Sequence, residues 1–115
     1  MSTEDCIFCK IRQGEVEGNI LYQDDHCFVI QDIRPKAPVH LLIIPNQHIT
    51  GLAYITPASE PTVGHLFVVA EEMARRQGVT LSGYRLVLNQ GPDSGQEVSH
   101  IHLHLLGGRR LGAMG

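Results

Sequence analysis

Apolar and polar residues alternate along several short segments of the chain, which is the pattern of strands in a half-buried sheet. Two of these segments, Ile20–Tyr22 and Cys27–Gln31, lie on either side of the pair Asp24 and Asp25. Aspartates between two apolar runs favour a tight turn. We therefore predict an antiparallel hairpin in the first third of the chain.

Three further strands follow from the same kind of pattern. The segment His40–Ile44 is apolar from residue 41 onward and is followed by Pro45, so we predict a central strand that is buried on both faces. A fourth strand is predicted at Tyr84–Asn89 and a fifth at Val98–Leu106. The segment Gln90–Gly95 between them contains glycine and is predicted to be a turn.

Two segments follow helical spacing instead. The first is Ile7–Arg12, for which Asp5 is the expected cap and Gly14 the stop signal. The second follows Ser59, its expected cap, and runs to about Gln77. The residues expected on the core face of this long helix are Val63, Leu66, Phe67, Ala70 and Met73.

The apolar face of the long helix is wider than one stripe, because Val68 and Val69 extend it. Either the helix is deeply packed, or it lies between its own sheet and a partner subunit. Strands on both sides of a helix, with hairpin-length connections early in the chain, favour the α+β class with a largely antiparallel sheet.

Length and composition fit one domain over residues 1–115. Charged residues make up 18% of the chain and its net charge is -3, so it offers no basic surface to a nucleic acid. The acidic start differs from a signal peptide, and no apolar run is long enough to cross a membrane. Three cysteines, an odd number, do not form a disulfide framework. We expect a cytoplasmic protein that binds neither nucleic acid nor membrane.

Three of the seven histidines stand at every second position, as His100, His102 and His104. On a strand these three side chains share one face at intervals of roughly 6.5–7 Å. The apolar residues between them then face the core. Three imidazoles on one face are costly to bury and titrate near neutrality, so they indicate chemistry and not packing.

Two kinds of chemistry fit this spacing, namely zinc binding and nucleophilic attack by a neutral imidazole. The turn before the strand, Asn89–Gly95, can offer backbone N–H groups to an anion, and Gln96 adds a neutral donor. Asp32, at the end of the second strand, can accept from ribose hydroxyls. The surroundings are therefore compatible with a nucleotide phosphate.

The segment HIHLHLL, His100–Leu106, resembles the signature of the histidine triad (HIT) family, specifically the branch of histidine triad nucleotide-binding (Hint) proteins. The resemblance extends through Ala37–Pro45, Gly83–Gly91, Gly95–Val98 and Gly107–Arg109. It implies a five-stranded antiparallel sheet with one long and one short helix. It also implies a homodimer in which two sheets join into one of ten strands.

The same resemblance implies a purine nucleoside phosphoramidase, which hydrolyses the P–N bond of adenosine or guanosine 5′-phosphoramidates. His102 is then the nucleophile that forms a nucleotidyl-histidine intermediate. His100 and His104 flank it, and His40 completes the histidine network. Glu97 stands where some members carry a serine, and it is a candidate proton donor.

The resemblance also assigns the residues that bind the purine nucleotide (AMP, GMP or their phosphoramidates). The walls of the base pocket are Ile7, Phe8, Ile11 and Leu42. The ribose contacts are Asp32 and Ile33. The phosphate contacts are Asn89, Gly95, Gln96, His102 and His104. Catalysis is expected to need no cofactor. Two other functions remain open, a dinucleoside polyphosphate hydrolase and a purine-nucleotide-binding adaptor with little catalysis.

A second candidate site begins with the pair Cys6 and Cys9. Two cysteines alone make only half of a zinc site. Some HIT proteins complete such a site with a histidine of a P-x-x-H-I segment and the first histidine of the triad. Here His48 and His100 stand at those positions, so the resemblance implies a structural zinc ion held by four residues.

Overall fold

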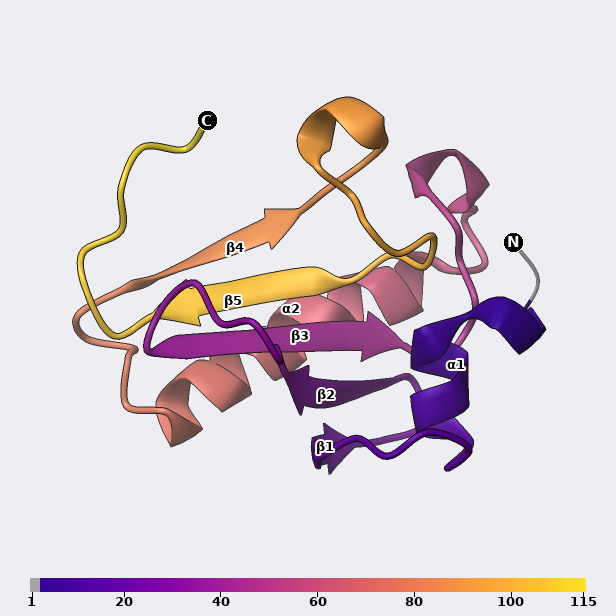
Figure 1. The fold of residues 1–115 in the computed structure, drawn as a ribbon, viewed down its shortest axis with the longest axis horizontal. Helices are drawn as coiled ribbons and strands as arrows, with labels where there is room; N and C mark the ends of the chain where they lie inside the picture. Colours follow the sequence, from indigo (N-terminus) through magenta and orange to yellow (C-terminus); the bar gives the residue numbers. More distant parts are fainter. Residues whose placement is uncertain (1–2) are drawn as a thin grey trace.

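The computed structural model describes residues 3–115 of the chain. Its centre is a five-stranded sheet in which all neighbouring strands are antiparallel, in the order β1-β2-β3-β5-β4 (Figure 1). The strands are β1 (Ile20–Gln23), β2 (Cys27–Gln31), β3 (Val39–Pro45), β4 (Tyr84–Leu88) and β5 (Leu103–Gly107). The predicted α+β class and sheet are confirmed, and β1 and β4 are the edge strands.

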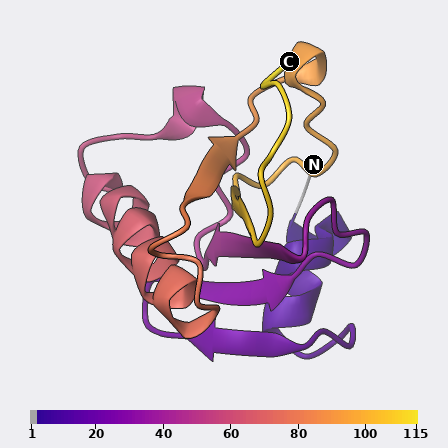
Figure 2. The same cartoon turned by 90° about the vertical axis from the view of Figure 1, so that its left-hand side faces the viewer.

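Two helices cover opposite faces of this sheet (Figure 2). The short helix α1 (Ile7–Arg12) packs on one face, and the long helix α2 (Glu60–Arg76) packs on the other. Three single-turn 3₁₀ helices lie in the connections, namely η1 (Thr3–Asp5), η2 (Leu52–Tyr54) and η3 (Pro92–Ser94). No helix among the described residues has the length and apolar character needed to cross a membrane.

Strand β3 is buried on both faces, as its apolar run predicts. Leu41 and Ile43 join the core beneath α2, whereas Leu42 and Ile44 join the core beneath α1. Alternate residues of a strand face opposite sides, so a strand between two helical layers is apolar at every position. This strand therefore fixes the position of both layers.

The core face of helix α2 is shifted from the predicted one. Leu66, Ala70 and Met73 are buried as expected, but Phe67 is 49% exposed and Val68 is 64% exposed. Val69 takes a core position instead. The wide apolar arc therefore has an inner part in contact with the sheet and an outer part on the surface.

The predicted cap residue is correct for the long helix and wrong for the short one, and neither cap position makes a side-chain hydrogen bond to the helix. Asp5 lies in η1, and the residue before the first turn of α1 is Cys6, which makes no side-chain cap hydrogen bond. Ser59 is the residue before α2, but its hydroxyl bonds to the backbone of Thr56. The bounds of both helices nevertheless agree with the predicted segments to within two residues, since apolar spacing and not capping determines them here.

The last strand is shorter than predicted. It begins at Leu103, and the residues from Val98 to His102 have no strand partner. Leu103 pairs with Ile43 on β3 and with Leu88 on β4, which is the last residue of that strand. Beyond this point the amide of Ile101 bonds to the carbonyl of Ile49 in a loop. His100 and His102 therefore precede the strand instead of lying on it.

The predicted hairpin between β1 and β2 is confirmed, and Asp24 organises its turn. Its carboxylate accepts hydrogen bonds from the backbone N–H groups of His26 and Cys27 and from the hydroxyl of Tyr22. It also lies 2.7 Å from Nε2 of His65 on α2. A single side chain thus connects the hairpin to the long helix.

Candidate active site and histidine–cysteine cluster

A cavity of about 1010 Å³ opens on the sheet face that carries α1, the face toward the viewer in Figure 1. Loop 32–38, loop 89–97 and the segment after β5 surround it. The predicted site residues that line it are Ile7, Phe8, Ile11, Asp32, Ile33, His40, Leu42, Asn89, Gly95, Glu97, His102 and His104. Residues from five separate parts of the chain therefore meet in one cavity.

The ring of His102 is held in one orientation by the backbone. Its Nδ1 atom lies 2.8 Å from the carbonyl oxygen of His100. Since a carbonyl oxygen only accepts, the proton of a neutral His102 is on Nδ1 and the lone pair is on Nε2. Phe8 packs edge to face on this ring, with 5.0 Å between centroids. The free nitrogen belongs to a ring that lines the cavity.

A chain of hydrogen bonds orients His104 in the same way. The backbone N–H of Lys36 donates to Nδ1 of His40 over 3.1 Å. Nε2 of His40 therefore carries the proton and donates to Nδ1 of His104 over 2.9 Å. Nε2 of His104 is then protonated, and this buried atom has no partner among residues 3–115. It is a donor available to a group bound in the cavity.

Burial keeps these histidines neutral. Burial, together with the neighbouring rings of His102 and His40 and the charge of Lys36, lowers the pKa of His104 to about 4 against the opposing effect of Asp32. Burial also lowers the pKa of His102 and of His40, although nearby carboxylates partly oppose the change. A neutral His102 has the nucleophilic lone pair that a protonated ring lacks.

Asp32 lies at the border of the histidine network. Its carboxylate is 3.5 Å from Nε2 of His40, and its other oxygen accepts from the backbone N–H of Arg34. The adjacent Ile33 is 91% exposed at the rim of the cavity. Both residues therefore line the cavity, and their predicted contact with a ribose remains a prediction.

Loop 89–97 forms another wall of the cavity, with Asn89, Gly95 and Glu97 facing it. Gly95 has a φ of 87°, a backbone conformation that favours glycine. Gln96 lies in the same loop, but its amide bonds to the N–H of Gly91 and to the carbonyl of Val98. The Gln96 side chain thus shapes the loop, and its predicted contact with a phosphate remains a prediction.

His100 points away from the cavity into a separate cluster. Its Nε2 donates to the carbonyl oxygen of Pro45 over 2.8 Å, which leaves a lone pair on Nδ1. That Nδ1 is 3.3 Å from Sγ of Cys6, 3.7 Å from Sγ of Cys9 and 3.2 Å from Nδ1 of His48. The four side chains of the predicted zinc set therefore lie together, and all their ligand atoms are within 4.8 Å of one another.

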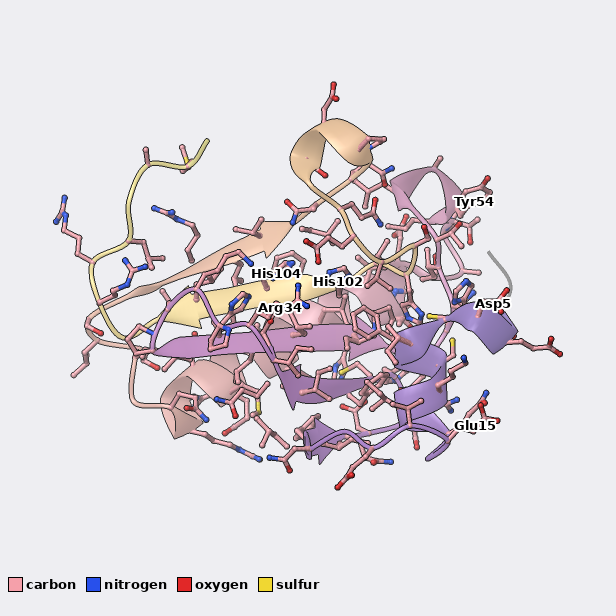
Figure 3. The ribbon with its side chains drawn as sticks, in the orientation of Figure 1. Asp5, Glu15, Arg34, Tyr54, His102 and His104 are labelled. Atoms are coloured by element: carbon pink, nitrogen blue, oxygen red, sulfur yellow. The ribbon has the colours of Figure 1, made fainter. Side chains whose placement is uncertain are left out.

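The cavity is also lined by charged residues that the sequence analysis did not assign to the site. Four cationic side chains line it, namely Arg34, Lys36, Arg85 and Arg109. Figure 3 labels Arg34, His102 and His104, which all line this cavity. Strand alternation could have indicated Arg85. It pairs with Leu106 and stands two residues before Val87, the partner of His104, so its side chain lies on the same face as His104.

Comparison with known proteins identifies the family. The HIT domain model matches residues 13–111. The purine nucleoside phosphoramidase of Escherichia coli is 45% identical over 111 residues, which cover 96% of this chain and 93% of that protein. The solved structure of a HIT family hydrolase from Legionella pneumophila has a TM-score of 0.91 and 42% identity, with 94% and 96% of the two chains covered.

A second solved structure bears on the cluster. It is a zinc-bound histidine triad family protein from Mycobacterium smegmatis, with a TM-score of 0.81 and 32% identity, and the match covers 94% of this chain and 78% of that one. The family model, the relatives and the arrangement of the histidines agree with one another. The chain therefore belongs to the HIT domain family, as one of its hydrolases.

Proposed function

We propose that the chain is a purine nucleoside phosphoramidase that cleaves the P–N bond of adenosine or guanosine 5′-phosphoramidates. The observation that carries the proposal is the hydrogen bond from Nδ1 of His102 to the His100 carbonyl, which leaves Nε2 as the nucleophilic atom. The E. coli relative, a purine nucleoside phosphoramidase, supports the substrate class.

The nucleotide has a defined place in this proposal. Its base contacts the apolar end of the cavity beside α1, where Ile7, Phe8, Ile11 and Leu42 meet. Its ribose lies at Asp32, and its phosphate lies between His102 and loop 89–97. Apolar walls with a few placed polar groups are the usual composition of such a site.

The reaction proceeds in two steps. Nε2 of His102 attacks the phosphorus, a bond forms between them, and the P–N bond breaks as the amine departs with its electron pair and takes up a proton. Water then splits the nucleotidyl-histidine and releases the nucleotide. Nε2–H of His104 stabilises the negative phosphoryl oxygens. Glu97, at the cavity wall, is the candidate donor of the proton that the amine needs.

Rapid quenching with an adenosine phosphoramidate, followed by peptide mass spectrometry, tests the proposal. We expect a mass gain of one nucleotide on the peptide that contains His102. A parallel rate comparison with diadenosine polyphosphate separates this activity from that of a dinucleoside polyphosphate hydrolase. Tight binding of AMP without turnover of either compound would instead indicate a nucleotide-binding adaptor.

The cluster of Cys6, Cys9, His48 and His100 is proposed to hold a structural zinc ion. In a tetrahedral site with ordinary zinc bond lengths, a sulfur and a nitrogen ligand are about 3.5 Å apart and two nitrogens about 3.3 Å apart. Here the three sulfur–nitrogen distances are 3.3, 3.4 and 3.7 Å, and the distance between Nδ1 of His48 and Nδ1 of His100 is 3.2 Å. A set of four protein ligands leaves no open position, so the ion would connect α1 to the sheet and take no part in the reaction.

A homodimer is also part of the proposal. Strand β4 is an unpaired edge of the sheet, and α2 exposes Phe67 and Val68. Pairing of two β4 edges would give a continuous sheet of ten strands and would supply the missing hydrogen-bond partners. Exposed apolar residues of α2 would be covered by the same contact.

A further inference from the structure

The cavity continues beyond the catalytic histidines, away from α1. Along β5 the residues that face it are first His104 and then Leu106, after His102 just before the strand. On the neighbouring strand β4, Val87 lies opposite His104 and Arg85 lies opposite Leu106. Arg85 is therefore one strand repeat, roughly 7 Å, past His104 on the same face. A nucleotide held against α1 leaves this far end free.

The cavity lining is cationic, and three of its cations, Lys36, Arg85 and Arg109, are connected to the far end through Leu106, His40 and one another. Four cations line the cavity, Arg34, Lys36, Arg85 and Arg109, against the two carboxylates of Asp32 and Glu97. The whole chain has the opposite sign, with a net charge of -3. Positive charge is therefore concentrated around this cavity.

None of these four cations forms an ion pair within 4 Å among residues 3–115. The arginines of α2 behave differently, because Arg75 and Arg76 both pair with Glu72. Cations that face a cavity without a carboxylate partner are available to an anionic ligand.

Two of the cations donate hydrogen bonds to backbone carbonyls of other segments that line the cavity. Nη2 of Arg109 donates to the carbonyl of Lys36 over 2.7 Å, and Nη2 of Arg85 donates to the carbonyl of Gly112 over 3.1 Å. The backbone of Lys36 is in turn bonded to His40. These contacts hold the positive charges near the histidine network, and the charge of Lys36 contributes to the lowered pKa of His104.

We propose that the far end binds the departing amine, and that the preferred amine carries a carboxylate. This inference rests on the proposed phosphoramidase function. Attack by His102 on the phosphorus places the leaving nitrogen on the opposite side from the nucleophile. A carboxylate on that amine meets the cations of the far end, whereas an uncharged amine gains nothing from them.

The covalent steps are those of the parent reaction. The bond from Nε2 of His102 to phosphorus forms, and the P–N bond breaks with its electron pair on nitrogen. That nitrogen takes one proton and leaves as a neutral amine, which takes a second proton from water to give the amino acid zwitterion at neutral pH. Water then cleaves the histidine–phosphorus bond and gives AMP and a free imidazole. No oxidant, reductant or further reactant is needed.

Two matched substrates test the inference, adenosine 5′-phosphoramidates whose amine is glycine or glycinamide. They differ in a carboxylate against a neutral amide of nearly the same size. We expect kcat/KM to be at least roughly fivefold higher for the glycine compound at low ionic strength. We expect this ratio to decline as salt is added, since salt screens exposed charges.

Removal of the cations should remove the preference. The double variant Lys36→Gln and Arg85→Gln should bring the glycine to glycinamide ratio close to one. The matched control, Arg75→Gln with Arg76→Gln, removes two positive charges from α2 and should keep the wild-type ratio. A wild-type ratio near one, or an unchanged ratio in the cavity variant, would overturn the inference.

Binding separates this inference from the proposed function. If neither compound is hydrolysed, the phosphoramidase function fails, and calorimetric affinities of the two compounds still decide the charge preference. Equal affinities would refute it. Diadenosine triphosphate is a further test substrate. If it is hydrolysed faster than the glycine and glycinamide compounds, and these two are hydrolysed at equal rates, the cations bind a polyphosphate and the inference is overturned.

Discussion

Nδ1 of His102 donates a hydrogen bond to the carbonyl oxygen of His100, only two residues earlier in the chain. The acceptor belongs to the backbone, so the orientation of the imidazole is set by the path of the chain before β5 and not by another side chain. This contact determines which nitrogen of His102 is free. Several outcomes can be expected from it and from the surrounding geometry.

His102→Ala removes the proposed nucleophile. Turnover of an adenosine phosphoramidate should fall by roughly a thousandfold or more, since loss of a nucleophile has effects of this size or larger. The affinity for AMP, measured by calorimetry, should change only about threefold, because most of the proposed contacts remain. His26→Ala is the control, since His26 contacts Thr62 and His65 outside the cavity. A His102→Ala enzyme with wild-type rates would exclude the covalent mechanism.

The stability of the protein should depend on the neutral state of His104. Its pKa is about 4 in the folded chain against 6.5 ordinarily. Between these values the unfolded chain binds a proton that the folded chain does not, so the free energy of unfolding should decrease as the pH falls from about 6.5 to about 4. Urea titrations at several pH values measure this slope.

His104→Gln provides the comparison for that pH series. The variant should be less stable at neutral pH, but its stability should change less between pH 6.5 and pH 4. Identical slopes for the two proteins would contradict the assignment of a lowered pKa to His104.

Metal removal should affect stability before it affects chemistry. We expect one zinc ion per chain by elemental analysis, and a lower thermal midpoint after treatment with a chelator. Cys9→Ser should abolish zinc binding. Cys27→Ala is the matched control. Cys27 is buried in the other core, beneath α2, so this variant should still bind the ion. Full zinc content in Cys9→Ser would show that the cluster is not the site.

Asp24→Asn should destabilise the hairpin and its contact with α2. Burial alone would raise the pKa of Asp24, but hydrogen bonds from His65, from two backbone N–H groups and from Tyr22 outweigh it and lower the pKa. The stabilisation is therefore present above the ordinary pKa and is lost as the pH falls below it. We expect a cost of about 1–3 kcal/mol at pH 7. Asp25→Asn, at the exposed neighbouring residue, should be nearly neutral in the same denaturation experiment.

Val68→Lys tests the dimer. A charge at this 64% exposed position on α2 should convert the proposed dimer into monomers in sedimentation or light-scattering measurements. Leu81→Lys introduces the same charge at a fully exposed residue away from α2 and should leave the mass unchanged. A monomeric wild-type protein would refute the dimer directly.

The comparison of sequence and structure is most instructive at β5. Alternation from Val98 to Leu106 predicted one strand with the three histidines on one face, but the side chains from His100 to Leu103 are all buried and His100 points into the histidine–cysteine cluster. The partners do not continue, because β4 ends at Leu88 and the chain then turns. Alternating side chains share a face only where neighbouring strands continue beside them, and the pattern carries no information on the length of those strands.

In the helices and in the site, too, some features could be predicted from the sequence and others could not. Apolar spacing located both helices, but the core face of α2 was displaced, with Val69 inward and Phe67 outward, because a wide apolar arc does not define its own centre. The family resemblance brought the cavity histidines together correctly. It gave no indication of Arg85, whose position depends on strand pairing across 21 residues of sequence.

His100 makes two contributions through different atoms. Its ring nitrogen belongs to the histidine–cysteine cluster, and its carbonyl oxygen orients His102, the proposed nucleophile. Any amino acid has a carbonyl, whereas only a histidine supplies that ring. A substitution at position 100 can therefore remove the proposed zinc ligand while keeping the carbonyl that orients His102, so zinc content and turnover are expected to be separable.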